Sequence, residues 1–134
     1  MASIDAIEGI GPKFATKLRK AGIRTTEGLL KRGSDRAGRK ELVAATGFSS
    51  HQILEWVNRA DLFRVKGVGE EYSDLLEASG VDTVKELRTR NAANLTEKMA
   101  EMNRKKRLVR RLPTESMVKR WIAAAKKLTP VVKY

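Results

Sequence analysis

The sequence contains no cysteine, which excludes a disulfide framework and a thiolate metal site. Aromatic residues are few (5%), and the apolar runs are only a few residues long, too short for a transmembrane helix. The first five residues lack the basic and apolar regions of a signal peptide. We therefore expect a cytoplasmic protein without a membrane partner.

Charged residues are abundant, at 33% of the 134 residues, and the formal net charge is +12. The charge is uneven: the net values are +5 over residues 1–60, −3 over residues 61–103 and +10 over residues 104–134. Such asymmetry is typical of proteins that bind a polyanion, and nucleic acid is the commonest polyanion in cells. The alternative is a basic, well-solvated surface that only keeps the protein soluble.

The chain repeats itself at an interval of 58 positions. This shift places the Gly9-Ile10-Gly11 triplet on Gly67-Val68-Gly69 and aligns many apolar positions between the halves. Trp56 matches Trp121 only if the second copy carries about seven extra residues. The sequence therefore predicts two units, 1–60 and 61–134, with a basic insertion near residues 104–111 in the second.

Both copies have the periodicity of helices. Apolar residues recur at three- and four-residue steps, and no stretch shows sustained period-two alternation. Gly22 and Gly80 are placed to end helices in a left-handed conformation, and Thr25 and Thr83 to cap the next ones. Further helices are expected over residues 34–45, from 49 or 50 toward 61, and from 113 to just before 130. The sequence predicts an all-α fold, one compact duplicated domain.

The Gly-Ile-Gly-Pro stretch at residues 9–12 must reverse the chain within a few residues. Gly9 and Gly11 permit positive φ, Ile10 can enter the core, and Pro12 suits the first helical position. A tight turn that caps a helix is one interpretation. The other is an anion site, in which backbone N–H groups at the helix start, with Lys13 and Lys17 beside them, hold a phosphate.

One stretch resembles a helix-hairpin-helix motif: Ile4-xx-Ile7-x-Gly9-Ile10-Gly11-xxx-Ala15-xx-Leu18-xxx-Gly22-Ile23. Nearly the whole chain also resembles a bacterial family of tandem helix-hairpin-helix proteins classed as a domain of unknown function. This closer resemblance is carried by residues 7–11, 53–57, 61–69, 71–77 and 108–113. It implies two helix-hairpin-helix units, each followed by further short helices. The broader motif implies that the hairpin binds the DNA backbone without reading sequence, and motifs of this kind sometimes hold a monovalent cation at the hairpin carbonyls.

The two copies differ just after the glycines. Glu70, Glu71 and Asp74 follow Gly69, and carboxylates there stabilise the helix start but repel phosphate. We expect the first hairpin to bind phosphate. The second hairpin, formed by Gly67, Val68 and Gly69, is expected to be structural or weak, and the acidic stretch over residues 70–86 is a candidate protein-binding surface.

The second basic candidate contains six cations in eight residues: Arg104, Lys105, Lys106, Arg107, Arg110 and Arg111. Each phosphate contact from such a segment would add salt-dependent affinity. The alternative is a solvated loop or helix end, pinned to the core by Leu108, Val109 and Leu112.

The aromatic residues and the single histidine are expected to have structural rather than chemical roles. Trp56 and Trp121 have core spacing, as do Phe14 and Tyr72. His51, the only histidine, has no ligand cluster around it and is expected at the surface or in a cap. No nucleophile–base motif or metal-ligand cluster is present, so we expect no catalytic residue, metal or cofactor.

These observations predict non-sequence-specific binding of nucleic acid, with duplex DNA favoured, through Gly9, Ile10, Gly11, Lys13 and Lys17 and through the basic segment. The alternative is a protein-interaction or scaffolding module. An accessory subunit that supplies DNA affinity to a separate enzyme is a third possibility.

Overall fold

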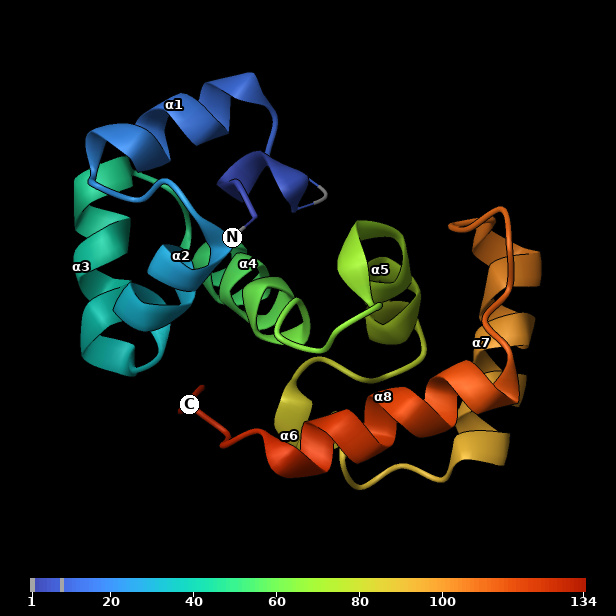
Figure 1. Cartoon of the computed structure of the whole chain (residues 1–134). Helices are drawn as coiled ribbons and strands as arrows, with labels where there is room; N and C mark the ends of the chain where they lie inside the picture. Colours follow the sequence, from blue (N-terminus) through green and yellow to red (C-terminus); the bar gives the residue numbers. More distant parts are fainter. Residues whose placement is uncertain (1, 8) are drawn as a thin grey trace. The chain divides into compact units, whose positions relative to one another are not determined.

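The structure, a computed structural model, describes residues 2–7 and 9–134, with the backbone alone described for Glu70. The all-α prediction is confirmed for this part of the chain. Its only β-type pairing is an isolated antiparallel bridge between Ser3 and Thr25. The helices (Figure 1) are a 3-10 turn η1 (Ile4–Ala6) and α1 (Pro12–Lys20), α2 (Thr26–Gly33), α3 (Arg36–Thr46), α4 (Ser50–Leu62), α5 (Gly69–Ala78), α6 (Val84–Leu87), α7 (Ala92–Lys106) and α8 (Glu115–Lys127).

The chain divides into two compact units. Unit 1 comprises Met1–Asp61 together with Val131–Tyr134, and unit 2 comprises Leu62–Pro130. The sequence predicts that residues 131–134 belong to the second unit. They group with unit 1 because the Lys133 amide donates to the Ser34 carbonyl at 2.7 Å and Arg39 donates to the Lys133 carbonyl at 2.6 Å.

Unit 1 is built from short, individually capped helices. The Thr25 hydroxyl accepts from the Gly28 amide at the start of α2, as the sequence predicted. The helix expected from Ser34 begins at Arg36 instead, because the Asp35 carboxylate accepts from the Gly38 amide. Gly47 ends α3 in the left-handed conformation, with φ 77°. The first helix of the expected hairpin motif is only the single turn η1.

The core of unit 1 is apolar and closed by three aromatic rings. Phe14, Phe48 and Trp56 lie with ring centroids 5.1 to 5.5 Å apart. The buried apolar side chains of the unit come from each of its helices and include Ile4, Ile7, Ile10, Leu18, Ile23, Leu29, Leu42, Ile53 and Val57.

Unit 2 has a core of its own. Its helices α5 and α6 pack against α7 and α8 respectively, and α7 packs against α8. Buried side chains from these helices and the segments between them form one cluster, which includes Leu62, Val65, Val68, Leu75, Leu76, Leu87, Leu95, Met99, Val109, Val118 and Trp121. Among the described residues, no helix is both long and apolar enough to cross a bilayer.

Candidate phosphate-binding turns and basic loop

The first candidate, here called the first glycine turn, covers residues 7–11. The Ile10 amide donates to the Ile7 carbonyl at 3.1 Å, and Gly9 has φ 92°, a conformation that strongly favours glycine. The Ile7 and Ile10 side chains are buried at 1% and 3% exposure. Only the Ile10 backbone can therefore face a ligand, while its side chain holds the turn on the core.

Gly11 is the N-cap of α1, and its backbone is extended, with φ −79° and ψ −179°. Any residue can adopt this conformation, so Gly11 does not use the positive φ that glycine permits. A Cβ built on Gly11 would have no heavy atom within 4 Å. Nothing in the described protein therefore excludes a side chain from this position, and the open space lies directly at the helix start.

The start of α1 leaves backbone donors that no described side chain caps. Pro12 has no N–H, and no described side chain caps the following amides of Lys13 and Phe14. The α1 dipole adds partial positive charge at the same point. Lys13 and Lys17 are exposed one turn apart on α1, and the Lys17 ammonium lies 5.5 Å from the centroid of the Phe48 ring. Lys17 therefore has a cation–π partner, whereas no ion pair joins Lys13 to another described residue.

The second glycine turn, residues 65–69, repeats the first with one difference. Its Val68 amide donates to the Val65 carbonyl at 3.2 Å, and Gly67 has φ 91°. Gly69, however, begins α5 with φ 57°, where Gly11 has φ −79°. Glycine at position 69 is therefore explained by the backbone alone.

Each turn lies close to a tryptophan at the matching position of its own unit. A Cβ at Gly9 would lie 3.7 Å from Nε1 of Trp56, and one at Gly67 would lie 3.3 Å from Nε1 of Trp121. Both tryptophans are buried, at 5% and 3%, as the sequence predicted. An arginine side chain also bonds to the loop after the first α-helix of each unit. Arg32 donates to the Ala21 carbonyl after α1, and Arg90 donates to the Gly80 carbonyl after α5.

The acidic stretch of residues 70–86 is largely engaged within the chain. Asp74, Glu77 and Asp82 each interact with other groups of the protein, and Glu86 pairs with Arg90 at 3.5 Å. Glu71 is exposed, whereas the side chain of Glu70 lies outside the described part of the structure.

The second basic candidate is here called the basic loop, residues 104–112, and belongs to unit 2. Arg104, Lys105 and Lys106 form the last turn of α7, where cations complement the helix dipole. In the alternative interpretation, three apolar residues pin this segment to the core, but only one of them is buried. Val109 is buried at 7%, but Leu108 and Leu112 are 37% and 44% exposed.

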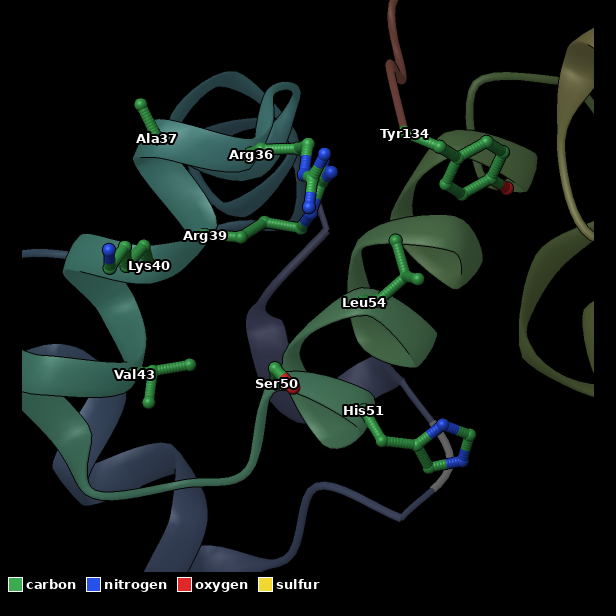
Figure 2. Close-up of a pocket in the computed structure, with 9 residues that line it drawn as sticks. All are labelled: Arg36, Ala37, Arg39, Lys40, Val43, Ser50, His51, Leu54 and Tyr134. Carbon is green, nitrogen blue, oxygen red and sulfur yellow. The ribbon is translucent and has the colours of Figure 1, made fainter.

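A groove of about 930 Å³ in unit 1 was not anticipated from the sequence. Figure 2 shows Arg36, Arg39 and Val43 on α3 facing Ser50 and Leu54 on α4, with Tyr134 at one end; Ala37, Lys40 and His51 complete the lining. Burial lowers the pKa of the Arg39 guanidinium, while Asp35 and Tyr134 oppose that shift. Arg39 donates to the carbonyls of Gly33 and Lys133 at 2.9 and 2.6 Å. It therefore holds the C-terminal segment in place.

The remaining candidates lie as follows. His51 is at the surface, as predicted, with an 88% exposed side chain 3.8 Å from the Glu55 carboxylate. Phe14 and Tyr72 are only partly buried against the tryptophans. No group of three or more potential metal ligands occurs among the described residues. A monovalent cation at the hairpin carbonyls stays a prediction.

The sequence-based predictions did not include the hydrogen bonds that Arg32 and Arg90 make to loop carbonyls. The two arginines lie 58 positions apart, so they match in the repeat alignment, and that match was a usable signal. The role of Arg39 carried no such signal, because its partner Lys133 is 94 residues away.

Comparison with curated proteins and with solved structures found no match. The family model described as "Domain of unknown function (DUF4332)" matches residues 8–128, nearly the whole chain. The chain therefore belongs to this family, DUF4332.

Proposed function

We propose that the protein binds nucleic acid, with duplex DNA favoured, through the phosphate backbone and without reading sequence. The single observation that carries this proposal is Gly11. Its conformation admits any residue and its Cβ position is empty. It nevertheless stands at a helix start whose amides no described side chain caps, with Lys13 beside them. A phosphate that approaches the backbone closely would explain why a side chain is absent there.

Two further features support the proposal. The two glycine turns, each followed by a helix and a left-handed glycine, fit a tandem helix-hairpin-helix assignment. The basic loop gives unit 2 a second polycationic surface. In this interpretation the second glycine turn is structural, because Gly69 is needed for its φ of 57° and a carboxylate follows it. The proposal involves no catalysis.

The test is duplex binding by fluorescence anisotropy across a salt series. Wild type is compared with the K13E/K17E variant and with charge reversal of the basic loop. A matched control, K31E/K40E, reverses two exposed cations of unit 1 outside α1 and so reproduces the change in net charge. We expect log affinity to fall linearly with log salt, with a slope shallower by about 0.9 for each phosphate that a variant no longer neutralises.

The K31E/K40E control should lower DNA affinity only through the overall electrostatic field of the protein. Its slope of log affinity against log salt should equal that of wild type. Equal effects of K13E/K17E and the control would refute a local phosphate site. Absence of binding at low salt would instead favour the rival proposal, a protein-interaction module that uses the acidic stretch and the basic C-terminal part.

A further inference from the structure

The basic loop of unit 2 is held rigidly. The Asn103 side chain makes two hydrogen bonds to Val109: its amide nitrogen donates to the carbonyl at 3.1 Å, and its oxygen accepts from the amide at 3.0 Å. The buried Val109 side chain adds an apolar anchor, and the Tyr72 hydroxyl donates to the Arg111 carbonyl at 3.0 Å. These contacts therefore hold the backbone of the loop between residues 103 and 111.

The side chains that this rigid loop presents are cationic and apolar together. Leu108 and Leu112 are the only large aliphatic side chains that are exposed in the described part of the chain. The six cations around them are all exposed, and among the described residues only Lys105 has an ion pair, with Glu101 at 3.5 Å. A surface with so many unpaired cations is complementary to a polyanion.

The loop also contains backbone strain. Arg107 ends α7 at φ 50° and ψ 49°, the one non-glycine residue with positive φ among those described. In unit 1 the corresponding helix, α3, ends at Gly47, with φ 77°. Arginine is less favourable than glycine in this conformation, and such strain concentrates at functional sites. Position 107 therefore carries an arginine side chain at an energetic cost that glycine would avoid.

From these observations we infer that the basic loop is a wedge for distorted DNA, an inference that rests on the proposed function. The arginines contact phosphates on either side of a base step, and Leu108 and Leu112 press against the bases between them. Insertion of apolar side chains beside arginine unstacks base steps, and this costs less where pairing is already defective. The protein should therefore prefer duplexes that contain a mismatch or a gap.

An anionic membrane surface is the other partner with matching charge. The anchored backbone of the loop favours DNA, because entry between stacked bases requires a defined approach, whereas a fluid lipid interface adapts to an apolar side chain. Lipid binding is therefore an outcome of the test.

The test compares three probes: a perfect duplex, the same duplex with a central mismatch, and vesicles containing phosphatidylserine. The variant L108Q/L112Q keeps every charge of the loop, and the matched control L128Q changes a half-buried leucine elsewhere in unit 2. Thermal denaturation establishes that each variant is folded. A 2-aminopurine base beside the mismatch reports unstacking.

Wild type should bind the mismatched duplex about tenfold more tightly than the perfect one and raise the 2-aminopurine fluorescence. The L108Q/L112Q variant should lose both effects while its salt slope on the perfect duplex is unchanged, and L128Q should keep both. Equal binding of the two duplexes by wild type, or a preference that survives in L108Q/L112Q, would overturn the wedge and leave the proposed function standing. Absence of DNA binding by the wild-type protein would overturn both the wedge and the proposed function. Binding to the vesicles alone, if it is lost in L108Q/L112Q, would assign the loop to lipid.

Discussion

The substitution Gly11→Ser is expected to raise stability and lower DNA affinity at the same time. Gly11 is the N-cap of α1 with an extended backbone, the conformation that serine adopts as an N-cap. Its hydroxyl would accept from the amide of Lys13 or Phe14. These are the donors that we assign to the phosphate, so the cap and the ligand compete for one site.

The two effects have different sizes. Serine is better than glycine at an N-cap by a few tenths of a kcal/mol, and an empty Cβ position adds no steric cost in the free protein. A hydrogen bond to a charged group is worth about 1.5–3 kcal/mol, so the loss of one amide donor should weaken phosphate binding about tenfold or more. Stability is measured by urea denaturation, and affinity by anisotropy at a single low salt concentration.

The matched control is Gly69→Ser in the second glycine turn. Its φ of 57° makes serine unfavourable by about 1 kcal/mol, so stability should fall, whereas DNA affinity should stay near that of wild type. If Gly11→Ser binds DNA as tightly as wild type, the donors at the start of α1 do not hold a phosphate. A large loss of stability in Gly11→Ser would contradict the geometry that we describe at this helix start.

Three further predictions concern the second glycine turn, the C-terminal segment and the basic loop. Gly67→Ala should cost about 1–2 kcal/mol in urea denaturation, because φ is 91° and the new methyl group would lie 3.3 Å from the Trp121 indole nitrogen; a neutral result would contradict this packing. Deletion of residues 131–134 should cost about 1–3 kcal/mol, because the buried Arg39 loses a carbonyl acceptor, and Arg39→Met in the same background should recover part of the loss. Arg107→Gly should stabilise the protein by about 1 kcal/mol and still weaken duplex binding; unchanged binding would remove Arg107 from the proposed contact.

The capping side chains show how far local sequence determines the helices. Thr25, Thr83 and Thr114 each accept a hydrogen bond from an amide three residues ahead, as residues of this type do wherever the chain can start a helix. These interactions depend only on neighbours in sequence, and the helix starts they mark were therefore predictable.

The longest helix, α7, shows where local reasoning was insufficient. Its buried residues, Leu95 and Met99, are few, and much of its surface is polar or charged, so its periodicity is weak. The Asn91 side chain nevertheless caps it, by accepting from the Asn94 amide at 3.0 Å. Packing of α7 against α5 and α8 supplies the stabilisation that the periodic pattern does not reveal.

The repeat itself determined that there are two turns, because the spacing of glycines and apolar residues constrains the backbone in both halves. Tertiary structure decided how the turns differ. Gly11 and Gly69 are the same residue at matching positions, but one caps α1 in an extended conformation and the other starts α5 with positive φ. In the basic loop, likewise, composition could not separate the buried Val109 from the exposed Leu108 and Leu112. The physical reason is the same in both cases: φ, burial and the free space around a residue depend on groups that are distant in sequence, and only the folded chain brings those groups together.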